Sequence, residues 1–217
     1  MLSFTIKSTI ISFLFLFLSA KTVDAQGEYL KSGQSGSIFG GVFGIDINNT
    51  VYSYGAAIGY SIQARVDIAG AIVNVKPKGG TGVTVFGAGA GLHLVKNRDF
   101  GILAFTSISK FSIDGFESNS YGFGLKIYGV FESNRAPRAF PYFSVGTVST
   151  KVRKLFARFP ERYYEEFRES KILISVGLDL IEHSNNKSPT PVFGVSLSHF
   201  DKFTSINVSL SVLYSSR

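Results

Sequence analysis

Bulky and small residues alternate strictly over VYSYGAAIGYSI, residues 51–62, and no other feature of the chain limits its fold as much. The odd positions after Val51 carry only serine, glycine and alanine, whereas the even positions are nearly all large and apolar: Tyr52, Tyr54, Ala56, Ile58, Tyr60 and Ile62. Successive side chains of a β-strand point to opposite faces. The segment therefore predicts a strand with one bulky face and one small face.

The same alternation recurs along the chain in segments of roughly ten residues separated by turn signals. We expect strands at 37–47, 51–62, 64–75, 83–95, 100–112, 120–132, 142–152, 171–181, 192–200 and 203–214. Consecutive hairpins without a crossover helix predict an all-β, up-and-down antiparallel arrangement. Ten strands is an even number, as single-chain membrane barrels require, and eight is the alternative if the segment 100–112 or the last pair is misread.

The composition of the small face indicates which side of the sheet meets water. Soluble barrels solvate one face with charged side chains, but here that face carries mainly Gly, Ser, Ala and Thr. Charged residues make up 17% of the chain, below the ~25% that is usual in soluble domains. We therefore expect a transmembrane β-barrel with the small face lining a narrow lumen and the bulky face in lipid. The aromatic residues expected at the membrane interfaces are Tyr52, Tyr60, Tyr121, Phe131, Tyr142 and Tyr214.

The beginning of the chain predicts export. A single lysine precedes an apolar run from Ser8 to Ala20, which is shorter than the ~20 residues of a membrane-spanning helix. Small residues then suit cleavage between Ala25 and Gln26. We predict a signal peptide over 1–25, a short lead over 26–36 and the barrel over 37–217. The chain has no cysteine, so backbone pairing and packing must hold the exported protein together.

The signal peptide and three segments carry a resemblance to a known family: GAAIGYSIQARVDIAGAI (55–72), FGAGAGLHL (86–94) and SINVSLSVLY (205–214). They resemble the small Gram-negative outer-membrane β-barrel proteins of the OmpX/OmpA-barrel type. The resemblance implies location in the outer membrane as a monomer, with lipids, including lipopolysaccharide, and the outer-membrane assembly machinery as partners. Such proteins commonly end on an aromatic residue, whereas Tyr214 is followed here by Ser215, Ser216 and Arg217.

Charged residues on the predicted inward face form a candidate lumen network. Its members are Asp46, Arg65, Asp67, Lys126, Glu132, Lys171 and Asp179, with His93 beside them. Because an unpaired buried charge is costly, we expect these groups to pair across the lumen and plug it. A conducting path for ions is the alternative.

The segment KVRKLFARFPERYYEEFRESK, residues 151–171, interrupts the strand rhythm. Pro160 can begin a short helix over the insert 153–170, in which Arg162 and Glu166 would pair one turn apart. If the N-terminus is periplasmic, this seventh connection is extracellular. Five basic residues could contact an anionic surface such as lipopolysaccharide phosphate: Lys151, Arg153, Lys154, Arg158 and Arg162. The charge pattern favours a solvated loop capped by a self-pairing helix over this contact.

No motif predicts catalysis, a cofactor or a metal site. Ser198, His199 and Asp201 are suitable residue types for a hydrolase, but alternation places Ser198 and His199 on opposite faces. The positive charge of +7 is spread along the chain and indicates no nucleic-acid partner. We expect a structural or surface-interaction role, in envelope integrity or adhesion. The alternatives are a narrow pore for small solutes, a lipid-modifying outer-membrane enzyme and an exported soluble β-barrel.

Overall fold

The structure is a computed structural model that describes residues 26–47, 51–113, 116–133, 136–158, 161–182, 189–201 and 203–216. The backbone alone is described at residues 26, 113, 133, 136, 154–158, 161–165 and 216. The predicted signal peptide, residues 1–25, lies outside the described residues. In the part of the chain that is described, no helix is long and apolar enough to cross a membrane.

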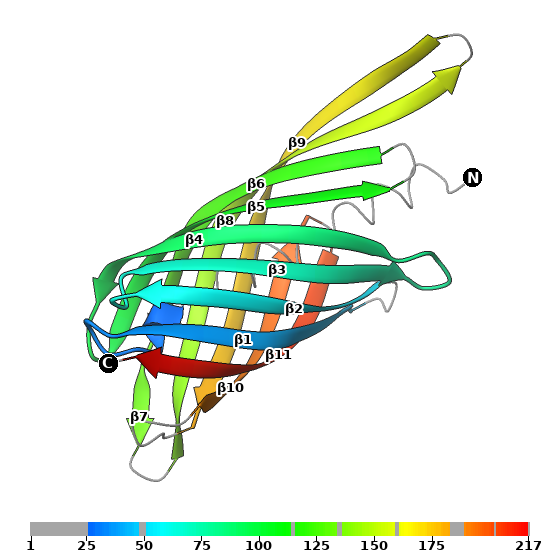
Figure 1. Cartoon of the computed structure of the whole chain (residues 1–217). Coiled ribbons are helices and arrows are strands. Elements are labelled where there is room, and N and C mark those ends of the chain that lie inside the picture. Colours follow the sequence, from blue (N-terminus) through cyan, green and yellow to red (C-terminus); the bar gives the residue numbers. More distant parts are fainter. Residues whose placement is uncertain are drawn as a thin grey trace.

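A closed antiparallel barrel forms the whole structure (Figure 1). Its elements are η1 (Gln26–Glu28), β1 (Ser35–Asp46), β2 (Val51–Ile62), β3 (Val66–Pro77), β4 (Val83–Lys96), β5 (Phe100–Ile113), β6 (Phe116–Gly129), β7 (Phe131–Ser133), β8 (Ala136–Arg158), β9 (Glu161–Ile181), β10 (Thr190–Phe200) and β11 (Phe203–Ser216). Neighbours in sequence pair with each other except β6 and β7, which both pair with β8, and β1 pairs with β11. With β6 and β7 counted as one interrupted strand, the described residues form a barrel of ten strands, which confirms the predicted strand number.

The two faces of each strand point as the alternation predicts. On β2, the side chain of Tyr54 is 53% exposed on the outside, whereas Ser53 is fully buried toward the lumen. Large apolar residues cover the outside of the other strands in the same way, including Phe43, Ile72 and Phe123. We call this outer covering the apolar belt.

One of the six predicted interfacial aromatics is wrong. Tyr142 is 8% exposed and faces the lumen, because the even positions of β8 point inward. Its ring lies over Gly177 of β9, where an added Cβ would be 2.5 Å from the ring. Tyr128 covers Gly101 of β5 in the same manner. Glycine on the inner wall therefore makes room for the tyrosine rings that fill the lumen.

Two clusters of buried apolar residues occupy the lumen. The first lies nearer the tip of the β8–β9 hairpin and contains Val42, Val51, Val73, Val75, Val83, Val85, Phe111, Val148, Leu173 and Phe200. The second lies where β1 begins and β11 ends, and contains Tyr29, Leu30, Ala64, Tyr128, Phe140, Tyr142, Ile181, Val192 and Leu213. We call these two ends of the barrel the hairpin end and the plug end.

The strand predicted over 64–75 begins two residues later than expected. Gln63 and Ala64 have positive φ values of 52° and 54°, and the Arg65 amide donates to the Ile62 carbonyl at 2.9 Å. These residues form the turn between β2 and β3, so β3 begins at Val66. Arg65 is consequently exposed on the turn and does not point into the lumen.

The predicted strand 120–132 is interrupted at Val130, whose amide donates to the Asp99 carbonyl at 2.7 Å. The alternation restarts after this break, and Glu132 is exposed on β7. The strand predicted over 142–152 begins earlier than expected, since β8 begins at Ala136 and includes Pro137 and Pro141. Pro141 lies opposite the break between β6 and β7, where β8 has no paired residue on that side. A missing amide donor is tolerated at such a position.

The insert 153–170 is not a loop with a helix. β8 and β9 continue as a paired antiparallel hairpin as far as Arg158 and Glu161, and Figure 1 shows this hairpin projecting beyond the other strands. Pro160 itself lies outside the described residues. Glu166 was expected to pair with Arg162 one helical turn away. In the hairpin it lies opposite Arg153 on the neighbouring strand instead.

Candidate functional site

The first described residues lie inside the barrel at the plug end, where η1 appears in dark blue in Figure 1. Gly27, Glu28, Tyr29 and Leu30 are all buried, and we call them the plug segment. Tyr29 and Leu30 belong to the apolar cluster of that end. The segment therefore fills the lumen from within, between the strands that enclose it.

Lys126 of β6 connects the plug segment to the barrel wall. Its Nζ donates to Oε1 of Glu28 at 2.9 Å, and Oδ2 of Asp179 lies 4.0 Å away. The Tyr29 hydroxyl donates to the same Asp179 oxygen at 2.9 Å. Lys126 and Glu28 are almost completely buried. Removing either one would leave a charge in a dry site, which is strongly unfavourable.

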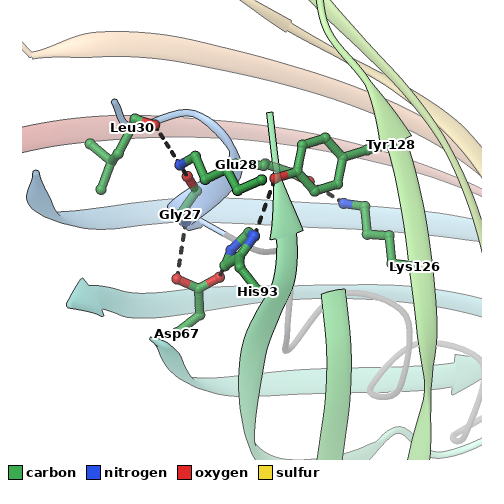
Figure 2. A network of polar contacts seen from close by, with 8 residues as sticks. Gly27, Glu28, Leu30, Asp67, His93, Lys126 and Tyr128 are labelled. Atoms are coloured by element: carbon green, nitrogen blue, oxygen red, sulfur yellow. Dashed lines mark hydrogen bonds and ion pairs between the residues drawn. The ribbon is translucent and has the colours of Figure 1, made fainter. Parts of the chain in front are cut away.

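A second series of contacts joins the plug segment to β3, β4 and β6 (Figure 2). The Gly27 amide donates to Oδ1 of Asp67 at 3.0 Å, and Nε2 of His93 lies 2.9 Å from Oδ2 of the same carboxylate. A carboxylate only accepts, so Nε2 carries the proton. On the other side of the ring, Nδ1 of His93 lies 3.2 Å from the Tyr128 hydroxyl.

Lys96 reaches the plug segment because β4 contains a bulge. The register between β4 and β5 shifts just after His93, and Lys96 then lies opposite the lumen-facing Gly101. Without this shift, alternation would place Lys96 on the outer face. Its Nζ instead donates to the carbonyl of Gly27 and, at 2.6 Å, to that of Leu30. These bonds satisfy carbonyl groups that are buried away from water.

β8 encloses the plug segment on its remaining side. Nη2 of Arg138 donates to the Tyr29 carbonyl at 3.4 Å, and the rings of Tyr29 and Phe140 meet edge to face with centroids 5.1 Å apart. Five strands, β3, β4, β6, β8 and β9, thus contribute polar or aromatic contacts to one short segment. The arrangement can close the lumen at the plug end.

The structure separates the seven predicted lumen charges into four groups. Asp67, Lys126 and Asp179 meet around the plug segment. Asp46 is buried at the other end of β1, opposite Ser205. Lys171 lies at the rim, with its Nζ 2.6 Å from Asp201 and 2.9 Å from Glu169. Arg65 and Glu132 are exposed, as described above. The charges that meet the plug segment therefore gather at the plug end, and Lys171 pairs separately at the opposite rim.

The plug segment, Lys96 and Arg138 are the functional residues that the sequence reasoning missed. The lead over 26–36 carries no periodic pattern, and its only signal is one acidic and two bulky residues, Glu28, Tyr29 and Leu30, before a Gly/Ser-rich stretch. If the alternation of β4 is continued without a bulge, it places Lys96 on the outer face of the barrel. Arg138 lies between Pro137 and Pro141, before the strand predicted over 142–152.

The β8–β9 hairpin forms a second feature of the site, at the opposite end. Nζ of Lys151 lies 2.8 Å from Oε2 of Glu166, and Nε of Arg153 lies 2.7 Å from Oε1 of the same carboxylate. Two of the five predicted surface cations therefore share one acidic partner. The side chains of the other three, at positions 154, 158 and 162, lie outside the description.

The ion pairs of the hairpin predict a response to pH. Hydrogen bonds from Lys151 and then Arg153 hold the pKa of Glu166 below its ordinary value. Because this pKa is lower in the folded hairpin, the stabilisation is complete above the ordinary glutamate pKa of about 4.3 and is lost as the pH falls through the lowered value. We expect amide exchange at residues 151–153, corrected for its intrinsic pH dependence, to stay constant from pH 7 to 5 and to rise only below about pH 4.

The control for this measurement is Glu166→Gln, which should exchange faster at pH 7 and show no step at low pH. A step between about pH 5 and 6 in the unmodified protein would contradict a lowered pKa.

The described residues contain no group of three or more His, Asp or Glu side chains that could hold a metal ion. Ser198 is fully buried on the lumen side, with Oγ of Ser175 donating to its Oγ at 2.9 Å. His199 faces outward, and its Nδ1 lies 2.9 Å from Oγ1 of Thr204. These two residues therefore lie on opposite sides of the barrel wall.

By sequence, no family model and no curated protein matches the chain. Solved barrels align with it at low similarity. The outer membrane protease OmpT from Escherichia coli shows 9% identity over 84% of this chain and 96% of its own, with a TM-score of 0.46. The β domain of the Bordetella autotransporter BrkA shows 10% identity over 86% and 100%, with a TM-score of 0.46. Ail, the attachment invasion locus protein of Yersinia pestis, shows 14% identity over 86% and 100%, with a TM-score of 0.40. These values identify no relative, and the class of protein, a closed ten-strand β-barrel, follows from the chain's own coordinates.

Proposed function

We propose that the protein is an outer-membrane β-barrel that does not conduct and has a structural or surface-interaction role, in envelope integrity or adhesion. The observation that carries the proposal is a lumen filled from both ends in a barrel whose apolar face points outward. A pore needs a continuous wet path, and this barrel has side chains packed across its axis at two levels.

The apolar belt supports the membrane part of the proposal. Soluble monomers rarely expose a continuous apolar surface, whereas the outside of this barrel exposes large apolar residues on neighbouring strands, such as Ile58, Ile72 and Phe86. In lipid the same surface is favourable, and closure of the sheet leaves no unpaired edge. The predicted signal peptide supports export to the outer membrane.

The filled lumen favours a structural role over a narrow pore. The plug segment closes one end through buried ion pairs, and the apolar cluster that includes Phe111, Leu173 and Phe200 closes the other. Loss of the plug segment alone would therefore leave the second closure in place. We assign the surface-interaction role to the hairpin end, where the β8–β9 hairpin projects.

The test combines location with conductance. The full chain is expressed in a Gram-negative host, the folded and heat-modifiable form is recovered from the outer-membrane fraction, and its conductance is recorded in a planar bilayer. We expect no steady conductance from the unmodified protein or from a variant that lacks residues 26–34, with a general-diffusion porin as the positive control for insertion. Steady conductance from the unmodified barrel would overturn the closed lumen. Recovery in the soluble periplasmic fraction would overturn the membrane location.

A further inference from the structure

Three basic residues lie in one row across four neighbouring strands. The register places Lys110 of β5 opposite Asn119 of β6, Asn119 opposite Lys151 of β8, and Lys151 opposite Arg168 of β9. The pairing of β6 with β8 joins the two halves of this row, Lys110 with Asn119 and Lys151 with Arg168. We call Lys110, Asn119, Lys151 and Arg168 the cation row.

The cation row lies on the outer face of the barrel, beyond the apolar belt. Going toward the plug end along the same faces, the next row is Ile108, Tyr121, Ser149 and Ser170, and the row after that is Thr106, Phe123, Thr147 and Ile172. Phe123 is 67% exposed and Ile172 is 60% exposed, so the belt reaches this level. Ile108 and Tyr121 in the intermediate row are also exposed, so the belt's edge on β5 and β6 lies two residues of strand, roughly 7 Å, from the cation row. On β9, four residues, roughly 13 Å, separate Ile172 from Arg168.

The charges of the cation row are largely uncompensated. Among the described residues, Lys110 and Arg168 have no acidic group within ion-pair distance, and both are exposed. Lys151 has a partner in Glu166, but that carboxylate is divided between Lys151 and Arg153. The surface next to the belt thus keeps an excess of positive charge, together with an amide donor at Asn119.

We propose that the cation row binds the phosphate groups of anionic membrane lipids at the hairpin-end interface. Adjacent strands are about 4.8 Å apart, so Lys151, Arg168 and the Asn119 amide can all reach one phosphate, and Lys110 can reach a second group beside it. The inference rests on the proposed membrane location. It favours a lipid over a soluble anion because the row faces the same direction as the belt, where headgroups would lie.

Glu166 sets the strength of this site. Its carboxylate competes with a phosphate for Lys151, so Glu166→Gln should strengthen lipid binding while the triple variant Lys110→Gln, Lys151→Gln and Arg168→Gln weakens it. A matched control removes three exposed cations from the plug end, through Lys31→Gln, Arg65→Gln and Arg98→Gln. The triple variant and the control lower the net charge equally.

The experiment measures retained lipid by native mass spectrometry of the full folded protein in detergent, after addition of phosphatidic acid or phosphatidylcholine. We expect the unmodified protein and the plug-end control to retain phosphatidic acid over phosphatidylcholine, and the triple variant to retain about 10- to 100-fold less of it. Glu166→Gln should retain more. Inorganic phosphate at millimolar concentration should not displace the lipid.

Equal retention by the triple variant and the control would overturn the proposal, as would displacement by inorganic phosphate. Flotation of every variant with phosphatidylcholine vesicles is measured in parallel. If all variants float but retention is equal, only the lipid site is wrong. If the unmodified protein does not float, the membrane location is wrong as well.

Discussion

Replacing Lys126 with methionine should release the plug segment and reduce its stability in the lumen by roughly 3–5 kcal/mol, because Glu28 and Asp179 would lose the cation between them. Nζ of Lys126 lies 2.9 Å from Glu28, and both side chains are buried. The cost is limited by the free energy of undocking, since the segment can leave the lumen to hydrate Glu28. The measurement is amide exchange at residues 27–30, which should become at least about a hundredfold faster.

The double variant Lys126→Met with Glu28→Gln separates the ion pair from simple packing. It removes both charges, so exchange at residues 27–30 should return most of the way to that of the unmodified protein. Lys110→Met serves as a surface control and should leave these amides unchanged. Equal acceleration in the single and double variants would show that the pair does not hold the plug segment.

Leu125→Arg should cost roughly 2–4 kcal/mol of unfolding free energy in detergent or lipid, because it places a cation near the middle of the apolar belt. Leu125 is 46% exposed, and it lies on β6 between the exposed Phe123 and Ile127. A cation in hydrocarbon loses its hydration, which is the source of the cost. Urea unfolding followed by the shift on an unboiled gel measures the difference.

Phe167→Arg is the matched control, because Phe167 is 42% exposed but lies on the projecting hairpin. There the new cation stays in water, and the change should be below about 0.5 kcal/mol. In a soluble protein the two positions, which are almost equally exposed, would respond alike. Similar costs at both positions would therefore show that the belt does not face lipid.

The alternation along the sequence was enough to predict which residues face outward, the number of barrel strands and their up-and-down antiparallel order. The reason is that a residue's side of the sheet follows from its parity along the strand, as Ser53 and Tyr54 show. The prediction of inward and outward faces failed where a bulge or a break in a strand shifts the alternation by one residue. The bulge after His93 turns Lys96 inward, and the break at Val130 leaves Glu132 outside.

The hairpin and the plug segment depend on contacts between distant parts of the chain, and local patterns do not report them. Arg162 and Glu166 have helical spacing, but Glu166 instead pairs with Arg153, which lies across the hairpin. The plug segment is defined by partners from five strands, and none of them is near it in sequence. Candidate lumen charges could be listed from the sequence, yet which of them meet depends on a segment that carries no periodicity.

The position of the plug segment also constrains the order of assembly. Its partners Asp67, Lys126 and Asp179 come from strands that are spread over most of the chain. Its docking place is complete only after β9 has paired with β8 and so joined the strands that carry Asp67 and Lys126. The first described residues of the chain therefore dock only after a strand more than 130 residues later, β9, is in place. A chain stalled before closure would display Glu28 and Tyr29 as a free tail, accessible to a protease that the finished molecule excludes.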